Sequence, residues 1–168
     1  WFPNRNTVLN ERNVPPDTAF CLDHDGGAIC MNGEKLATTT RTLHFSVMIR
    51  DGQDGVSAGY ATLTVDGISG PFKVTQPQDS VATFWTMGTS HFVNWNVART
   101  DVAPIECANV RILLSVDDGD TWPYVLAANT PNDGGQQVTL PFVETTTARI
   151  KVEAVGNVFF DVSDAFTI

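Results

Sequence analysis

The sequence predicts an all-β protein made of two β-sandwich modules. Hydrophobic and polar residues alternate along most of the chain, and this period of two is typical of strands. Gly, Pro or a run of β-branched residues interrupts every window of about a dozen residues, so no segment keeps a helical repeat. In the second half, turn residues recur at intervals of about 8 to 12 positions, as expected of a sandwich rather than of alternating strands and helices.

The clearest strand pair is expected around the loop DGQDGVSAGY. The apolar face of TLHFSVMIRD carries Leu43, Phe45, Val47 and Ile49. His44 falls on the opposite face and is interpreted as an outward strand residue. The segment ATLTV repeats the alternation with Ala61, Leu63 and Val65. We therefore expect these two segments to pair.

The segment from residue 14 to residue 40 holds a hairpin signal and two cysteines. Asn32-Gly33 favours a hairpin, because both positions tolerate positive φ, so AICMNGEKLA is expected to form one. Cys21 and Cys30 flank the short loop CLDHDGGAIC. A zinc site would need a second pair of Cys or His ligands, so a disulfide is favoured. A disulfide in turn favours an oxidising, extracellular setting.

A domain boundary is expected at DGISGPF, where Gly, Ser and Pro separate periodic segments. The predicted domains are residues 1–70 and 71–168. The strands expected in the second domain are FKVT, ATFW, HFVNWNV, NVRILLSV, TWPYVLAA, QQVTLPF, ARIKVEAV and FFDVSDAFTI. Their inward sets include Val93, Trp95 and Val97, then Val110, Ile112 and Leu114, then Ile150, Val152 and Ala154. Trp85 and Trp95 are expected to anchor the core, since each would remove about 200 Å² from water.

The stretch SVDDGDTW crowds acidic residues between two predicted strands. Its positions with a turn-forming role are Ser115, Asp117, Gly119, Thr121 and Trp122. Asp117 can accept backbone N–H groups across the bend, Gly119 can adopt positive φ, and the two hydroxyls can tie the strand ends. A calcium-binding EF-hand would need a continued D-x-D-x-D-G frame and a later Glu, which the stretch lacks. We therefore interpret it as a structural turn.

Composition limits the classes of partner. The net charge of −9 comes from scattered Asp and Glu, which argues against nucleic acid or an anionic membrane as partner. No apolar run approaches the roughly 20 residues of a membrane helix, and Trp1 to Arg12 does not have the pattern of a signal peptide. Because the chain opens on Trp1-Phe2-Pro3, we expect it to be a piece of a longer protein with any export signal upstream.

Several motifs carry a family resemblance. The pattern S-x-D-x-G-x-T-W resembles the Asp-box, a structural β-hairpin motif of sialidase propellers and other β proteins. The elements WNVART, LLSVDDGDTW, LAANTPNDG, TTTARIKVEAVGNVFFD and the terminal FTI resemble a module C-terminal to the catalytic domain of large secreted bacterial zinc metalloproteases of the reprolysin-like class. This resemblance covers nearly all of residues 72–168 and implies an immunoglobulin- or fibronectin-III-like sandwich.

The first domain is similar to the region that precedes this module in such proteins. FPN at Phe2 to Asn4 and the strand RTLHFSVMIRD carry this likeness. It implies a partial cadherin- or PKD-like β domain within residues 1–70. The segment Asn13 to Thr40 departs from the family pattern and is interpreted as an insertion that carries the cysteine loop.

The protease chemistry of that family does not carry over to this chain. The sequence has no HExxH, and His24, His44 and His91 lie on separate segments with no pair at helical spacing to hold zinc. There is no GxSxG elbow, and Cys107 is interpreted as a buried thiol rather than a nucleophile. We expect a non-catalytic accessory module of a zinc metallopeptidase, acting as a spacer or binding substrate protein, polysaccharide or a cell surface. Its partner within the parent chain would be the catalytic domain.

Calcium is the alternative cofactor. The loops DHDGG and DGQDG place carboxylates two or three positions apart, at Asp23, Asp25, Asp51 and Asp54. Such loops can point several oxygens at one hard cation, which would make the chain a calcium-dependent adhesion module. Against this, Asp-Gly is the commonest turn chemistry.

The residue types suggest two further functions, a glycosidase and a carbohydrate-binding module. The pairs Asp161 with Asp164 and Asp117 with Asp120 could be spaced as in a glycosidase, but both are interpreted as solvated acids at strand ends and turns. A carbohydrate-binding module would need exposed aromatic residues. The candidates are Trp1, Phe84, Trp122 and Tyr124. Aromatic residues of sandwiches usually lie in the core or cover a hairpin, so the sequence leaves this alternative open.

Overall fold

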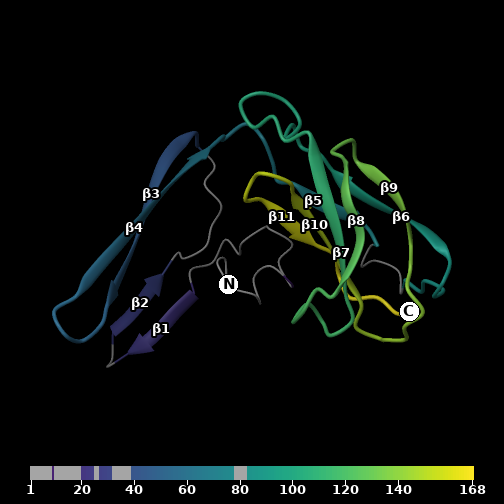
Figure 1. The fold of residues 1–168 in the computed structure, drawn as a ribbon, viewed down its shortest axis with the longest axis horizontal. Helices are drawn as coiled ribbons and strands as arrows, with labels where there is room; N and C mark the ends of the chain where they lie inside the picture. The colour runs from purple at the N-terminus through teal and green to yellow at the C-terminus, as the bar shows by residue number, and fades with distance from the viewer. Residues whose placement is uncertain (1–8, 10–19, 25–26, 32–38, 78–82) are drawn as a thin grey trace. The chain divides into compact units, whose positions relative to one another are not determined.

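The computed structural model describes Leu9 and residues 20–24, 27–31, 39–77 and 83–168; for residues 20–24 and 27–31 it describes the backbone only. Within these ranges the chain forms strands β1 to β11 (Figure 1). The prediction of an all-β fold is confirmed. None of the residues so described belongs to a helix long and apolar enough to span a membrane.

The chain divides into two compact units. One unit is Ala37–Ile68, and the other comprises Trp1–Leu36 together with Ser69–Ile168. The division after Ile68 falls inside the DGISGPF segment. The smaller unit contains β3 (Arg41–Arg50) and β4 (Val56–Val65), which pair along their full length as an antiparallel hairpin. The predicted pairing of these segments is confirmed.

A second hairpin lies early in the chain. Strand β1 (Phe20–His24) pairs antiparallel with β2 (Gly27–Met31), and Cys21 lies directly opposite Cys30 in the register. The second half of the hairpin predicted within AICMNGEKLA lies outside the described residues, so that hairpin stays a prediction, while its first half forms β2 and pairs with the segment before it. The dipeptide between the strands, Asp25-Gly26, belongs to the same class of hairpin-turn sequences as Asn-Gly.

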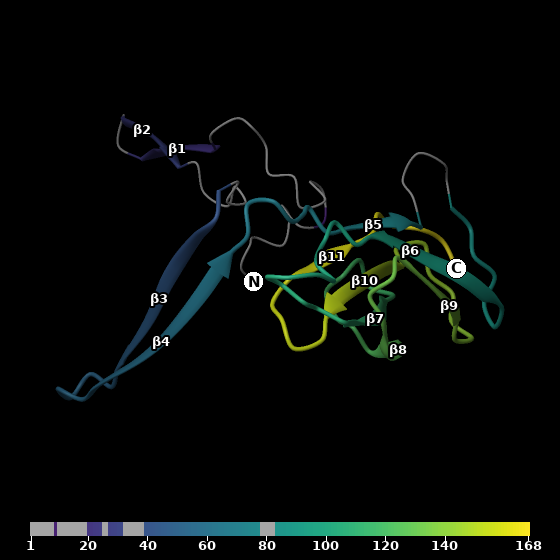
Figure 2. The same cartoon turned by 90° about the horizontal axis from the view of Figure 1, so that it is seen from above.

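The larger unit contains a β-sandwich built from two antiparallel sheets (Figures 1 and 2). The four-stranded sheet has the order β11-β10-β7-β8. Its strands are β7 (Asn109–Ser115), β8 (Tyr124–Pro131), β10 (Arg149–Ala154) and β11 (Phe160–Val162). The three-stranded sheet has the order β5-β6-β9. Its strands are β5 (Lys73–Gln76), β6 (Ser90–Asn96) and β9 (Gly135–Thr139).

One hydrophobic core fills the space between these two sheets. Its fully buried members include Val93, Val110, Ile112, Leu114, Ile150 and Val152. These come from β6, β7 and β10 at alternate positions, as predicted, whereas Ala154, the last residue of the predicted inward set on β10, is only half-buried and does not belong to the core. Trp85 and Trp95 are both buried in the same cluster, as predicted. Val97 packs against the core from a partly exposed position.

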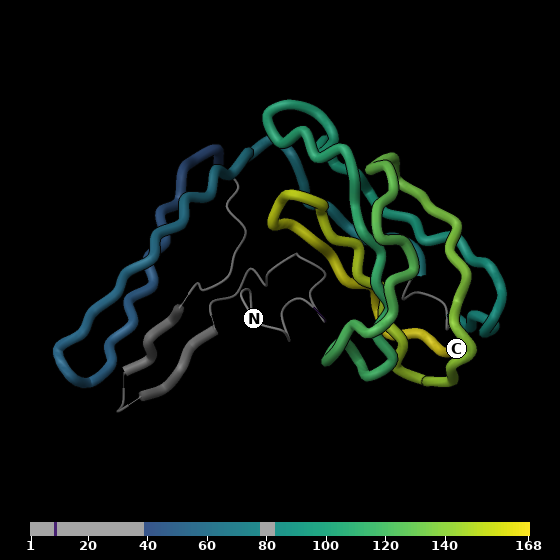
Figure 3. The backbone as a smooth tube through the Cα atoms, viewed as in Figure 1, coloured from purple at the N-terminus to yellow at the C-terminus, as the bar shows by residue number. Residues whose placement is uncertain are grey.

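The segment before β6 and the C-terminal segment lie side by side (Figure 3). The predicted strand ATFW is reduced to a bridge between Phe84 and Thr167, supported by a hydrogen bond from Trp85 N to Thr167 O of 2.9 Å. Trp85 turns into the core, where its ring meets Phe166 at a centroid distance of 4.8 Å. Phe84, the next residue toward the N-terminus, therefore points outward.

Candidate functional site

The acid-rich bend between β7 and β8 is held together by its own side chains. Asp117 Oδ1 accepts hydrogen bonds from Ser115 Oγ at 2.6 Å and from Thr121 N at 2.9 Å, and its Oδ2 accepts one from Thr121 Oγ1 at 2.5 Å. Gly119 N donates to Ser115 Oγ at 2.8 Å. The hydrogen bonds from Ser115 and Thr121 stabilise the charged carboxylate and lower the pKa of Asp117 to about 2. Asp117 thus accepts hydrogen bonds from hydroxyl and amide groups of its own bend.

The neighbouring acidic residues have other partners. Asp118 and Gly119 both adopt positive φ, +58° and +84°, a conformation that Gly adopts freely and Asp tolerates. This backbone directs Asp118 Oδ1 to Arg149 Nε at 2.7 Å. Asp120 N donates to Asp117 O at 3.2 Å, which closes the turn. The adjacent carboxylates of Asp117 and Asp118 therefore point to different partners.

In the loop DGQDG, the predicted calcium ligand Asp51 accepts hydrogen bonds from the backbone of its own loop. Asp51 Oδ1 accepts hydrogen bonds from the backbone N–H groups of Gln53 at 2.7 Å and Gly55 at 3.0 Å. The carboxylate of Asp51 occupies the space where a side chain on Gly55 would lie. Asp54 sits at a positive φ of 67° in the same loop. Asp51 is thus already engaged by the loop backbone.

The other predicted calcium loop is described only in part. Asp23 lies on β1 opposite Ala28, and Asp25 lies outside the described residues. Across the described ranges, no three His, Cys, Asp or Glu side chains come together in a group that could hold a metal ion. Calcium binding by these loops stays a prediction.

Asp161 corrects one expectation. The sequence interpretation placed it as a solvated acid at a strand end, but its exposed fraction is 0%. It accepts a hydrogen bond from Val74 N on Oδ2 at 2.6 Å, linking β11 to β5 of the opposite sheet. Its buried Oδ1 has no hydrogen-bond partner among the described residues. Burial raises the pKa of Asp161 to about 7, although the Val74 N–H group and Lys73 oppose this rise.

This position is not suited to hydrolysis of a sugar. A carboxyl group enclosed between two sheets cannot touch a substrate, whereas an acid–base pair must flank the bond that it cleaves. The sequence missed the buried carboxyl because strand alternation does not say which face of a short strand is inside. The only signal was the contrast with Phe160 and Val162, the apolar neighbours on the other face.

The cysteines fall into two groups. The register of β1 and β2 places Cys21 opposite Cys30, and their side chains lie outside the described part of the structure. Cys107 is buried, and its thiol donates a hydrogen bond to Asn109 O at 3.2 Å. Burial raises the pKa of the Cys107 thiol, which suppresses the thiolate form that a nucleophile needs.

The two histidines whose side chains the structure describes, His44 and His91, lie in different compact units. His91 stacks on Trp85 with ring centroids 4.7 Å apart, and its Nε2 lies 2.8 Å from Thr89 Oγ1. His44 belongs to the other compact unit, where its Nδ1 lies 3.2 Å from Thr62 Oγ1. Each of these rings is thus engaged by packing or by a neighbouring hydroxyl.

The predicted surface aromatics differ in their exposure. Phe84 is 67% exposed, whereas Trp122 and Tyr124 are partly buried and Trp1 lies outside the described residues. Sequence reasoning missed Phe142, which is 87% exposed. Its PFV context at the end of a predicted strand resembles that of a core residue, so no local signal marks it as a surface residue.

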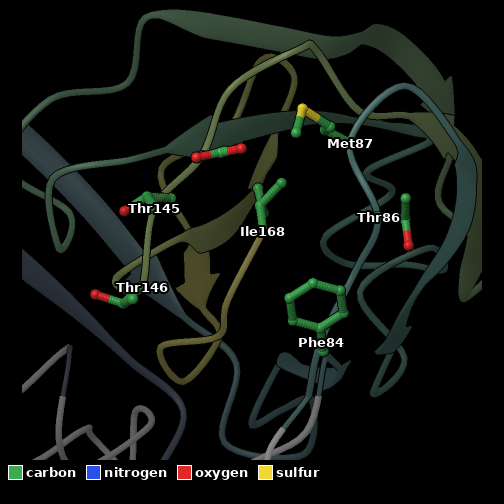
Figure 4. A pocket seen from close by; sticks show the side chains of 7 residues that line it. Phe84, Thr86, Met87, Thr145, Thr146 and Ile168 are labelled. Carbon is green, nitrogen blue, oxygen red and sulfur yellow. The ribbon is translucent and has the colours of Figure 1, made fainter.

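Phe84 borders a shallow, open depression of about 630 Å³ (Figure 4). The depression is lined by Phe84, Thr86, Met87, Glu144, Thr145, Thr146 and Ile168. The hydroxyl of Thr145 is used by the fold, because it donates to Val116 O at 2.9 Å. Phe142 lies close by, since its ring covers Gly88, the residue after Met87. The surface therefore offers mainly apolar contacts with a polar rim.

Comparisons with protein-family models, with curated proteins and with solved structures found no match for this chain. The likeness to metalloprotease modules rests on the sequence motifs alone. Family membership, and the function that it would imply, are therefore matters for a proposal.

Proposed function

We propose that this chain is a non-catalytic accessory module of a secreted bacterial metalloprotease of the reprolysin-like class. Its role is to space the catalytic domain of the parent chain and to bind substrate protein. The observation that carries the proposal is the closed hydrogen-bonding of the acid-rich bend. Asp117 is engaged by Ser115 and Thr121, and Asp118 by Arg149, so the most acidic stretch of the chain maintains the fold.

The strand order supports an immunoglobulin- or fibronectin-III-like class. In the nomenclature of those folds, β5, β6 and β9 correspond to strands A, B and E of one sheet. Strands β11, β10, β7 and β8 then correspond to G, F, C and C′ of the other sheet. Sandwiches of this class carry loops on a rigid scaffold, a construction that suits spacing and binding. The bend after β7 would be an Asp-box-type hairpin on this scaffold.

The cysteine register supports a secreted protein. Residues that face each other across an antiparallel pair have Cα atoms about 4.5 to 5.5 Å apart. That separation lies inside the range of about 4.4 to 6.8 Å found for disulfides. Cys21 and Cys30 face each other in this way, so their backbone is placed for a disulfide bond. Disulfides persist in oxidising, extracellular settings.

The depression beside Phe84 is the surface through which the module would bind protein. Phe84, Met87 and Ile168 supply apolar area, and an open surface suits an extended segment lying across it. The net charge of −9 disfavours acidic polysaccharides. We therefore favour apolar segments of unfolded or fibrous protein substrates as the ligand.

Retention of the chain on immobilised gelatin or denatured casein tests this function. The variant Phe84→Ser should lose retention, because it removes the largest apolar contact of the depression. Val158→Ser is the matched control, since Val158 is also 67% exposed but lies in the loop between β10 and β11. Equal retention of both variants would remove Phe84 from the binding surface. Cleavage of either protein by the purified chain would overturn the non-catalytic assignment.

The purified chain and its Phe84→Ser variant also test the two alternative functions. Retention on an insoluble polysaccharide, lost in Phe84→Ser, would favour a carbohydrate-binding module. A calcium-dependent adhesion module predicts a melting temperature that rises with calcium and falls with a chelator, because a ligand that binds the folded state stabilises it. We expect no rise of the melting temperature with calcium, since the described calcium candidate Asp51 already accepts two backbone hydrogen bonds.

A further inference from the structure

Leu9 is buried on the outer face of the four-stranded sheet. Its exposed fraction is 5%, and it clusters with Val162, Trp122 and Phe160. Asp161 reaches Val74 on the opposite sheet, so its neighbours on β11, Phe160 and Val162, point away from the core. This apolar cluster is therefore separate from the core between the sheets.

Arg149 binds the backbone of Leu9. The residue is 7% exposed, and its Nη1 donates to Leu9 O at 3.2 Å and to Ser163 O at 3.0 Å. Its Nε is paired with Asp118 Oδ1 at 2.7 Å, which fixes the guanidinium and offsets its charge. A buried guanidinium needs such partners, so the carbonyl of Leu9 satisfies part of its demand for acceptors.

The bend after β7 leaves space for the leucine side chain. A Cβ atom on Gly119 would lie 3.1 Å from Leu9 Cδ2, so a larger residue there would press on it. Trp122 forms a wall of the same site, and Lys151 Nζ lies 5.0 Å from the centroid of its ring. We use the term leucine socket for Gly119, Trp122, Arg149, Phe160 and Val162.

We propose that the leucine socket is a docking site for Leu9. The side chain of Leu9 lies in an apolar recess of the socket, and its carbonyl oxygen accepts a hydrogen bond from Arg149. These two residues are 140 positions apart in the sequence. Docking covers an aromatic and aliphatic patch that would otherwise face water. The acid-rich bend thus gains a second role, since Asp118 and Gly119 shape the socket. This inference goes beyond the proposed function and uses none of the residues around Phe84.

A double-mutant cycle on the full chain tests the docking. Leu9→Ala should lower the urea midpoint of the sandwich, whereas Leu9→Met, which conserves volume, should keep it. In a Val162→Ala background, the loss caused by Leu9→Ala should fall to less than about half, because the two side chains share one contact. Val152→Ala is the matched control: Val152 is buried on the core side of β10, so its effect should add to that of Leu9→Ala.

Fluorescence provides an independent readout. Leu9→Asp should shift the emission of Trp122 to the red and raise its quenching by acrylamide, with the Trp122→Phe chain used to subtract the other tryptophans. If the loss of stability caused by Leu9→Ala adds in full to that of Val162→Ala, as it should to that of the control Val152→Ala, the proposal is overturned. An unchanged Trp122 signal in Leu9→Asp would overturn it equally, because the socket would then be closed without Leu9. Neither result bears on retention by gelatin, so this proposal can fail without the proposed function failing.

Discussion

Asp161 makes the stability of the sandwich depend on pH in an unusual direction. The pKa of its carboxyl group is about 7 in the folded protein, against an ordinary value of 3.8. The folded state therefore holds the proton more tightly than the unfolded state. The stability that this gives is fully present at low pH and is lost as the pH rises through about 7. A carboxylate with a lowered pKa behaves in the opposite way.

The size of the effect follows from the pKa difference. The difference between about 7 and 3.8 is about 3 pKa units, and each unit corresponds to about 1.4 kcal/mol, so the total is about 4 kcal/mol. The unfolded state loses its proton from about pH 3.8 upward, so part of this loss already occurs below pH 5. Between about pH 5 and pH 8 the expected loss is therefore about 3 kcal/mol. Among charged side chains, Lys73 lowers the pKa of this carboxyl group and Asp164 raises it.

The perturbation that isolates this group is Asp161→Asn. The amide oxygen of Asn can still accept the hydrogen bond from Val74 N, and the side chain no longer titrates. The free energy of unfolding of the variant, relative to that of the unmodified chain, should rise by about 3 kcal/mol from about pH 5 to pH 8. Asp164→Asn is the control, because it removes a neighbouring carboxylate that is only partly buried.

Urea unfolding followed by tryptophan fluorescence measures this difference, since Trp85 and Trp95 are buried in the core that Asp161 borders. Asp117 does not interfere. Its pKa is lowered to about 2, so its contribution is present above pH 3.8 and is lost only as the pH falls toward 2. Parallel pH profiles for the unmodified chain and Asp161→Asn would refute the reasoning. They would mean that the carboxyl group is solvated in both folded and unfolded states.

Two other predictions concern the bend and the cysteines. Asp117→Ala should lower the free energy of unfolding near neutral pH by about 1 to 2 kcal/mol, because it leaves hydroxyl and amide donors of a partly exposed bend without their acceptor. Asp117→Asn should cost less in the same urea titration, and a cost as large as that of Ala would contradict the hydrogen-bond account. The unfolded, unreduced chain should show one reactive thiol, that of Cys107, and the reduced chain three. Three thiols before reduction would exclude a bond between Cys21 and Cys30.

Much of the fold could be predicted from local pattern. Alternation placed Val93, Ile112 and Ile150 on inward faces, and all three are buried between the sheets. The composition of SVDDGDTW indicated a bend, and the hydrogen bonds that join Ser115 to Asp117 and Gly119, and Asp117 to Thr121, link residues two to four positions apart. Such features depend on neighbours in sequence, so the sequence displays them directly.

Features that depend on distant residues were not predicted. Strand alternation gives two faces without saying which is inside, and Asp161, which was interpreted as a solvated acid at a strand end, is buried. The docking of Leu9 carries no local signal, because it depends on Arg149 and Val162 at the other end of the chain. The exposure of Phe142 likewise follows from where its loop leaves the sandwich.

The sequence by itself determined that this protein is built of strands, where many of them run, and which bend is closed by its own acids and hydroxyls. These properties arise from steric preferences and hydrogen bonds within a few residues. Only the tertiary structure decided that a carboxyl group lies between the sheets and that Leu9 lies against Arg149. The reason is physical: burial and pairing of distant groups depend on how whole sheets pack, and that packing is set by all of their side chains together.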